Sequence, residues 1–233
     1  MRVLGIQKVT RGKIMINKYD ETKAMDYENG FYLTSDISRM GNIIAHYELY
    51  KKIIDLPGDV IELGVFKGGS IVQFATFREL LENEKSRKII GFDVFGEFPK
   101  ADNKADEIFR EKWVKETENS FLTIDEIYSS LKYKKVENVE LVKGDIVATL
   151  PKYIDQHPYL KVSLLHVDTD VHKPSKVGLE LLYDRVVKNG VIIFDDYGVA
   201  GETDAVDEFL MDKDYVINKF PFSHRKPSYI IKK

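Results

Sequence analysis

The chain has 233 residues, of which 43% are hydrophobic, enough for one sizeable α/β domain around a buried core. Its formal net charge of −3 gives no overall basic field for nucleic acid, and no apolar stretch approaches the roughly 20 residues of a membrane span. The absence of cysteine excludes disulfides and cysteine-ligated metals. Residues 1–18 lack the apolar core of a signal peptide, so we expect a cytoplasmic protein without nucleic-acid or membrane partners.

The first 34 residues differ in character from the rest of the chain. Residues 1–34 are rich in charged residues and tyrosine and have weak periodicity, which predicts an N-terminal arm or lid before a single domain over residues 35–233. Ser35 or Asp36 is expected to cap the first helix of that domain, because apolar residues follow at helical spacing through residues 37–54.

Strand and helix patterns then alternate along the chain. Strands are predicted over residues 59–63, 88–93, 139–143, 162–167 and 190–194, with a closing strand pair over 215–218 and 228–231. Helices are predicted over residues 71–83, from Thr123 through Leu131, over 150–157 with Pro151 in the first turn, from Pro174 or Ser175 to Asn189-Gly190, and over 205–211. This alternation predicts a doubly wound α/β sheet with right-handed crossovers.

The segment between the second and third predicted strands is longer than an ordinary crossover. Residues 95–135 are highly charged and contain Trp113, the only tryptophan of the chain. Phe109 and Trp113 stand four residues apart, on one face of a predicted helix. They pack locally or form a lid over a ligand, and the sequence leaves both interpretations open.

A glycine-bearing turn follows the first predicted strand. After Glu62, it contains Gly64, Lys67, Gly68, Gly69 and Ser70. Phe66 replaces the second glycine of a dinucleotide-binding fingerprint, and Lys67 precedes its glycines, unlike the lysine of a P-loop. The turn therefore favours a nucleoside ligand without a pyrophosphate, with Glu62 available for an ammonium group. A tight turn without any ligand is the alternative.

Acidic residues end the next two predicted strands as well. Asp93 ends the second strand, where a carboxylate can accept hydrogen bonds from both hydroxyls of a ribose. Asp145 and Ile146 follow the third strand, where Asp145 or the backbone could accept from an adenine amino group. Each residue alone is often only a cap or turn residue, but successive strand ends meet at one edge of a parallel sheet.

Two acidic clusters end the fourth and fifth strands. Asp168 and Asp170 follow the apolar run that contains His166, and Asp195 and Asp196 follow residues 191–194. Neighbouring parallel strands would bring these carboxylates into one crevice, where they cannot all remain ionised without a cation or a proton. A metal site is therefore predicted, with capping of strands and helices as the alternative. His166 is expected to be a buried core residue.

Together these motifs resemble the class I S-adenosylmethionine-dependent methyltransferases. The likeness is greatest to the macrocin O-methyltransferase family, which methylates sugar hydroxyls, and it covers about residues 35–212. The segments that carry it are Gly64-Val65-Phe66-Lys67-Gly68-Gly69-Ser70, Val167-Asp168-Thr169-Asp170, Asp195-Asp196-Tyr197-Gly198 and Ser38-Arg39-Met40-Gly41-Asn42. The resemblance implies a Rossmann-like sheet of seven mostly parallel strands with an antiparallel C-terminal strand.

The resemblance also implies a role for each acidic strand end. Glu62 and the glycine turn would hold the methionine part of S-adenosylmethionine, Asp93 its ribose, and Asp145 with Ile146 its adenine. The metal ligands for Mg²⁺ would be Asp168, Asp195 and Asp196, of which Asp168 would also contact the cofactor. The general base would be Asp170, with Lys173 and His172 as alternatives on the following loop. In this sequence Thr169 replaces a common glycine of the family motif, and residues 171–175 also depart from it.

The function implied by the resemblance is Mg²⁺-dependent methylation of a sugar hydroxyl, on a nucleotide-linked deoxysugar, a natural product or a polysaccharide, by a homo-oligomer. A catechol-type methyltransferase is the first alternative, because both acceptors offer vicinal hydroxyls. A nicotinamide-dependent Rossmann oxidoreductase is a second alternative, against which the imperfect glycine pattern argues. A non-catalytic cofactor-binding protein is the third.

Overall fold

The computed structural model describes residues 15–16, 19–223 and 226–233, and these divide into two compact units between residues 35 and 36. In the first unit, β1 (Met15–Ile16) pairs with β2 (Tyr19–Asp20) in antiparallel orientation. A short 3₁₀ helix (Glu21–Lys23) leads into α1 (Ala24–Thr34), in which no residue is buried.

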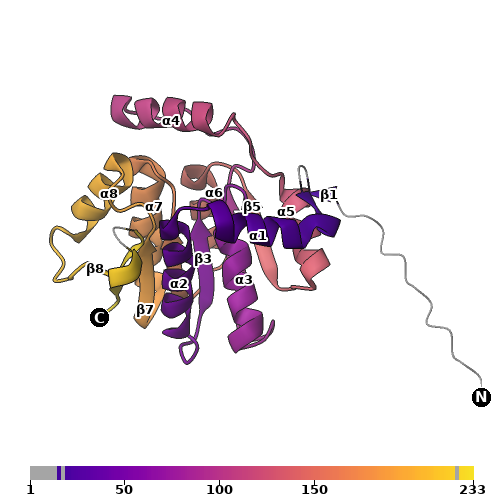
Figure 1. Cartoon of the computed structure of the whole chain (residues 1–233). Helices are drawn as coiled ribbons and strands as arrows, with labels where there is room; N and C mark the ends of the chain where they lie inside the picture. The colour runs from indigo at the N-terminus through magenta and orange to yellow at the C-terminus, as the bar shows by residue number, and fades with distance from the viewer. Residues whose placement is uncertain (1–14, 17–18, 224–225) are drawn as a thin grey trace, which may run out of the picture. The chain divides into compact units, whose positions relative to one another are not determined.

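The second unit is built on a seven-stranded sheet with the strand order β5-β4-β3-β6-β7-β9-β8 (Figure 1). The strands are β3 (Asp59–Leu63), β4 (Ile89–Asp93), β5 (Val139–Lys143), β6 (Val162–Val167), β7 (Val186–Phe194), β8 (Asn218–Lys219) and β9 (Ser228–Ile231). The strands from β5 to β7 pair in parallel, and β9 runs antiparallel to both β7 and β8. The predicted fold class is confirmed.

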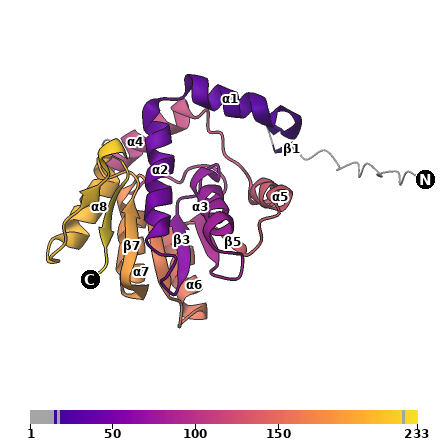
Figure 2. The same ribbon diagram turned by 60° about the horizontal axis from the view of Figure 1, so that its bottom comes forward.

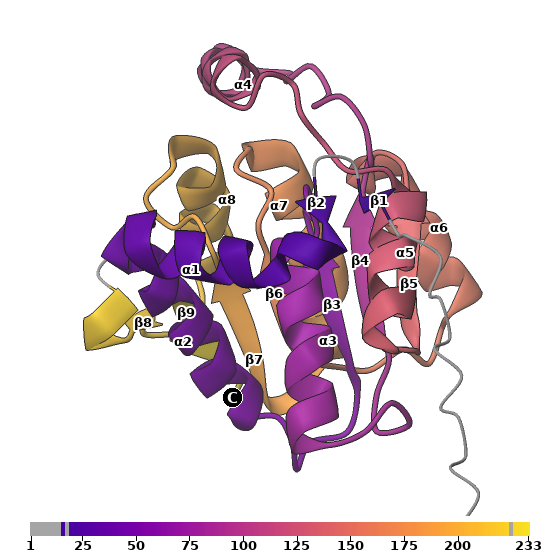
Figure 3. The ribbon, with the colours of Figure 1, turned by 45° about the vertical axis from the view of Figure 1, so that its right-hand side comes forward.

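Helices cover both faces of this sheet, as Figures 2 and 3 show. The helices are α2 (Ile37–Lys51), α3 (Gly69–Leu81), α4 (Lys104–Glu116), α5 (Ile124–Lys134), α6 (Ile146–Gln156), α7 (His172–Leu182) and α8 (Ala200–Leu210). The helices α2 and α3 lie on one face, and α6, α7 and α8 lie on the other. Because both faces are covered, all six residues of β6 are buried, which explains its unbroken apolar run.

The helix predicted over residues 150–157 begins earlier than expected. It starts at Ile146, because the Asp145 side chain accepts a hydrogen bond from the Val147 N–H at 2.9 Å and caps the first turn. Pro151 consequently lies inside the helix and not in its first turn. Its missing N–H weakens the helix, but burial of Ile146, Leu150 and two further residues of the same face compensates.

The end predicted for the next helix, at Asn189-Gly190, also lies too far along the chain. The helix α7 ends at Leu182, and Val186 already pairs with Val162 in the sheet. The register between β6 and β7 shifts after this pair, so Asn189, at φ +65°, and Gly190 form an irregularity within β7. The helix α8 likewise begins at Ala200, ahead of the predicted start at residue 205.

The described residues include no helix that is both long and apolar enough to cross a membrane.

Candidate functional site

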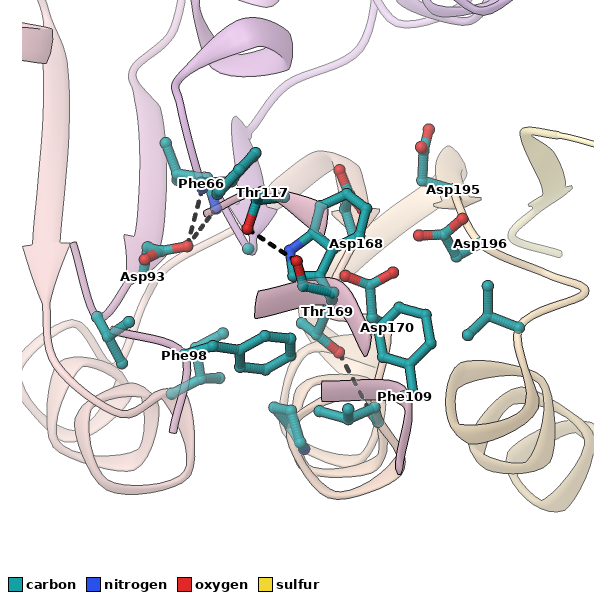
Figure 4. A pocket seen from close by; sticks show the side chains of 18 of the residues that line it. Phe66, Asp93, Phe98, Phe109, Thr117, Asp168, Thr169, Asp170, Asp195 and Asp196 are labelled. Carbon is teal, nitrogen blue, oxygen red and sulfur yellow. Dashed lines mark hydrogen bonds between the residues drawn. The ribbon is translucent and has the colours of Figure 1, made fainter. Parts of the chain in front are cut away.

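A cavity of about 920 Å³ opens at the carboxyl ends of the parallel strands (Figure 4). Of the residues predicted to form the site, it is lined by Gly64, Lys67, Gly69, Ser70, Asp93, Asp145, Ile146, Asp168, Asp170, Asp195 and Asp196. The other three, Glu62, Gly68 and His172, do not line it. The structure therefore brings together the acidic strand ends and the glycine turn, which are far apart in the sequence.

The glycine turn has a shape that side chains would block. Gly64 adopts φ +92°, and a Cβ atom there would lie 1.8 Å from the Asp168 carbonyl oxygen. Gly68, at φ +77°, caps α3, and a Cβ atom on Gly69 would meet no atom within 4 Å. The turn thus permits close approach of the β3 and β6 ends and leaves the first turn of α3 open toward the cavity.

The carboxylate of Asp93 supports this turn. Its Oδ2 accepts hydrogen bonds from the Val65 and Phe66 N–H groups at 2.8 and 2.9 Å, and its Oδ1 accepts from the Phe95 N–H at 2.7 Å. A carboxylate offers about four acceptor positions, so Asp93 keeps roughly one for a ligand. A role for Asp93 toward ribose therefore stays a prediction.

Glu62 supplies an unsatisfied acceptor next to the glycine turn. The side chain is fully buried, its Oε1 accepts a hydrogen bond from the Ser70 hydroxyl, and its Oε2 has no hydrogen-bond partner among the described residues. Burying a carboxylate oxygen without a partner is unfavourable. An ammonium group would satisfy it, so the residues present fit the methionine part of S-adenosylmethionine.

The three predicted metal ligands lie together. Asp168, Asp195 and Asp196 each offer one oxygen, and these oxygens lie within 4.8 Å of one another. Burial, together with the negative charge of Asp195, raises the pKa of Asp168 well above its usual value. Three carboxylates are a donor set that suits Mg²⁺. The described residues hold two further groups of possible ligands, but both include histidine, which suits transition metals.

Asp195 differs from its neighbours because two histidines face it. Its Oδ1 contacts His46 Nε2 at 2.9 Å and His166 Nε2 at 3.3 Å, and it accepts a hydrogen bond from Asn42 at 3.2 Å. Burial alone would raise the pKa of Asp195, but the hydrogen bonds from His166 and His46 outweigh it and hold the pKa well below its usual range. The ionised form is thus favoured at Asp195 and disfavoured at Asp168 beside it.

His166 and His46 connect the two halves of the site. His166 is fully buried, as predicted, but its ring lies between Asp195 and Glu62, with Nδ1 3.4 Å from Glu62 Oε1. Burial lowers the pKa of His166, but its hydrogen bond to Asp195 and the nearby carboxylate of Glu62 raise the pKa well above the usual value. His46 and Asn42 come from α2, and no spacing signal in the sequence connects them to Asp195.

The predicted base, Asp170, lies beside Asp196 of the acidic cluster. Asp170 adopts φ +62°, and burial, followed by the neighbouring Asp196, raises its pKa well above the usual value. Lys226, from the loop before β9, donates a hydrogen bond to Asp196 Oδ1. Nothing in the sequence marks Lys226, a lone lysine in a loop, as part of a site.

Glu202 joins the loops that carry the acids. This residue of α8 is fully buried, its Oε1 accepts from the Asp196 N–H at 2.9 Å, and its Oε2 accepts from the Thr169 N–H at 3.2 Å. Burial, together with the charge of Asp196, raises the pKa of Glu202 to about 8. The sequence contains no sign of this role, because the helix was predicted to begin only at residue 205, after Glu202.

The two alternatives to Asp170 as base are directed elsewhere. The Nε2 of His172 lies 3.2 Å from Glu208 Oε2 on α8, and the side chain does not line the cavity. Lys173 lines the cavity but donates to Asp102 at 2.5 Å. The structure therefore leaves Asp170 as the predicted base within the acidic cluster.

The sequence also matches a known family. The model of the macrocin-O-methyltransferase (TylF) family matches residues 13–218, and the chain therefore belongs to this family, whose members are S-adenosylmethionine-dependent O-methyltransferases. A curated relative from Streptomyces olivaceus, 8-demethyl-8-(2,3-dimethoxy-alpha-L-rhamnosyl)-tetracenomycin-C 4'-O-methyltransferase, is 26% identical over 159 residues, which cover 66% of this chain and 58% of that protein. The chain thus spans less than two thirds of that relative's length.

Solved structures share the fold. CalS11, a calicheamicin methyltransferase, has a TM-score of 0.67 at 23% identity, over 89% of this chain and 84% of that chain. The O-methyltransferase NovP has a TM-score of 0.70 at 21% identity, over 84% of this chain and 80% of that chain. This likeness shows a shared fold, and the family match favours the methyltransferase hypothesis over the nicotinamide-dependent alternative.

Proposed function

We propose that the protein transfers a methyl group from S-adenosylmethionine to a sugar hydroxyl in a Mg²⁺-dependent reaction. The observation that carries this proposal is the position of the Asp168, Asp195 and Asp196 carboxylates, which converge in the same cavity as the glycine turn. The family membership supports methyl transfer to oxygen, and the relative from Streptomyces olivaceus, named as acting on a rhamnosyl group, supports a sugar acceptor.

The residues divide the work between the two ligands. The buried, unpartnered oxygen of Glu62 receives the ammonium group of the cofactor, and the open turn at Gly69 lets the cofactor approach the backbone. Asp168, Asp195 and Asp196 hold Mg²⁺, which when bound supplies Lewis-acid polarisation of the acceptor hydroxyl. Since transfer of the sulfonium methyl needs an oxygen held in line with it, positioning by these residues contributes most of the catalysis.

Asp170 takes the proton of the acceptor hydroxyl in this scheme. Burial raises its pKa, so its carboxylate is a stronger base than that of an exposed aspartate. Lys226 balances part of the negative charge through its contact with Asp196. The predicted contacts to the cofactor stay as they were, with Asp93 toward the ribose and Asp145 with Ile146 toward the adenine. That the enzyme is homo-oligomeric and cytoplasmic also stays a prediction.

Mass spectrometry of methylated products tests the proposal. The protein is incubated with S-adenosylmethionine, Mg²⁺ and a panel of rhamnosides and catechols. Asp168→Asn and Asp196→Asn should each slow methyl transfer to a rhamnoside by about 100-fold or more, while the exposed Asp204→Asn on α8 should leave it unchanged. Full activity of Asp168→Asn in the presence of a chelator would refute the metal role, and methylation of catechols alone would favour the catechol-type alternative.

A further inference from the structure

Two buried histidines converge on one oxygen of Asp195. The Nε2 atoms of His46, from α2, and His166, from β6, lie 2.9 and 3.3 Å from Asp195 Oδ1. These three atoms lie within 4.8 Å of one another. His46 and Asp195 line the cavity, so ions in the cavity have access to the cluster. Two imidazoles and one carboxylate are a donor set for divalent transition metals and not for Mg²⁺.

The spacing of the three atoms matches that of ligands around one ion. Nitrogen and oxygen ligands of Zn²⁺ lie about 2.0–2.2 Å from the metal, so two of them at right or tetrahedral angles are roughly 2.8–3.5 Å apart. Both separations from Asp195 Oδ1 fall in this range. The ring of Phe74 lies 5.1 Å from that of His46 and 5.3 Å from that of His166, so packing holds both imidazoles in place.

Hydrogen bonding alone accounts poorly for the contacts of Asp195. Its Oδ1 also contacts the amide nitrogen of Asn42, one helical turn before His46, at 3.2 Å. This single oxygen therefore has three polar neighbours, whereas a carboxylate oxygen offers about two acceptor positions. If the two histidines are ligands of one ion together with Asp195, only Asn42 needs an acceptor position.

Each histidine also has an oxygen beside its other ring nitrogen. Gln73 Oε1, from α3, lies 3.2 Å from His46 Nδ1, and Glu62 Oε1 lies 3.4 Å from His166 Nδ1. Histidines that ligate metals typically direct one ring N–H at such an outer oxygen, which leaves the lone pair of the other nitrogen for the metal. With the protons on Nδ1, both Nε2 lone pairs face the Asp195 carboxylate, an arrangement that a cation between them stabilises.

We propose that His46, His166 and Asp195 bind a divalent transition-metal ion such as Zn²⁺ or Co²⁺, beside the three aspartates assigned to Mg²⁺. The ion joins α2, β6 and the end of β7. Asp195 is shared by the two sites, since the two oxygens of a carboxylate can ligate two different ions. Three protein ligands leave coordination positions open, as in catalytic zinc sites and unlike closed structural ones. The inference depends neither on methyl transfer nor on the acceptor.

Titration with Co²⁺ tests the inference, because the visible absorption of Co²⁺ reports its ligand geometry. Metal-free protein is saturated with Mg²⁺, and Co²⁺ is added while heat and absorption are recorded. One equivalent should bind and give an intensified visible band, which Zn²⁺, with its full d shell, should remove by competition. Absence of binding, or binding that excess Mg²⁺ prevents, would overturn the inference and leave the histidines as hydrogen-bond partners of Asp195.

Variants locate the ion on the histidines. His46→Gln and His166→Gln keep a hydrogen-bond donor but lose a direct ligand, so each should weaken Co²⁺ binding by about 100-fold or more. Gln73→Met removes only an outer oxygen and should weaken it by about 10–100-fold. His157→Gln, at the end of α6 and outside the cavity, is the control and should change nothing. Circular dichroism checks that each variant folds, and unchanged Co²⁺ binding in both folded ligand variants would refute the site.

Asp168→Asn separates this inference from the proposed function. It removes a ligand assigned to Mg²⁺ but none of the histidine site, so Mg²⁺ binding should fall while Co²⁺ binding and its visible band remain. Loss of Co²⁺ binding in Asp168→Asn, with full binding in His46→Gln, would place the ion among the aspartates and overturn the inference alone. Failure to methylate any acceptor would count against the proposed function, and the Co²⁺ titration would still decide the inference.

Discussion

Glu62 holds one carboxylate oxygen inside the protein without a hydrogen-bond partner among the described residues. The other oxygen already accepts from Ser70 and lies 3.4 Å from His166, so neighbouring side chains do not relieve the first one. Such an arrangement is unfavourable in the folded protein and is usually explained by a ligand or by catalysis. In the proposed function, that ligand is the ammonium group of the cofactor.

Glu62→Gln should therefore weaken cofactor binding with little change in fold. Replacing the carboxylate by an amide removes a charge-assisted hydrogen bond, which contributes about 1.5–3 kcal/mol, so the affinity for S-adenosylhomocysteine should fall by about tenfold or more. Calorimetry measures this directly, with Glu97→Gln, an exposed glutamate outside the cavity, as the matched control. An affinity equal to that of the unchanged protein would remove Glu62 from the cofactor site.

At the scale of elements, the turn from β3 into α3 depends on one glycine. A Cβ atom at Gly64 would collide with the Asp168 carbonyl oxygen. Because the Asp168 N–H donates a hydrogen bond to the Leu63 carbonyl at 2.9 Å, neither strand end can move aside freely. Gly64→Ala should lower the free energy of unfolding by about 2 kcal/mol or more, from overpacking and from positive-φ strain. Gly69→Ala is the control, because its Cβ would meet open space. Equal stability of both variants in chemical denaturation would contradict this account.

The helix α8 controls the acidic loops through Glu202. Its two oxygens hold the N–H groups of Thr169 and Asp196, so one side chain sets the spacing between the β6 and β7 loops. Residues that orient metal ligands typically change metal affinity by 10–100-fold, and Glu202→Ala should weaken Mg²⁺ or Mn²⁺ binding within roughly that range. Glu202→Gln retains one acceptor and should lose less. Glu208→Ala, on the surface of the same helix, should have no effect in the same titration, and an equal effect would argue against a specific role for Glu202.

Across the whole molecule, the sequence predicted what lies at strand ends and missed what helices bring to them. Continuous apolar runs identified the five parallel strands, and acids after these runs identified the cavity, because parallel strands end at one edge. Contacts such as His46 with Asp195, 149 residues apart, have no local signature. The helix errors at Pro151 and Asn189 arose because tertiary packing and sheet pairing outweighed local breaker residues.

The acidic cluster should also make the stability of the metal-free protein depend on pH. The pKa values of Asp168, Asp170 and His166 are raised well above their usual values, and that of Glu202 is raised from 4.5 to about 8. The folded protein therefore retains protons that the unfolded chain has already released. Stability from these groups is complete below their unfolded pKa values and is lost as the pH rises through the folded ones. The lowered pKa of Asp195 has the opposite effect on stability, but only at pH values below the ordinary aspartate pKa of 3.8.

In a chelating buffer, the melting temperature should consequently fall between about pH 5 and about pH 8, by about 2–4 °C for each kcal/mol lost at this chain length. Saturating Mg²⁺ should reverse the loss of stability at the upper pH, since a ligand at 100 times its dissociation constant stabilises the folded protein by about 2.7 kcal/mol. The ion should stabilise less at the lower pH, where protons compete for the carboxylates. Differential scanning calorimetry measures both effects, and Asp168→Asn should reduce the pH dependence and the Mg²⁺ effect together. A melting temperature that Mg²⁺ raises equally at both pH values would show that the ion binds elsewhere.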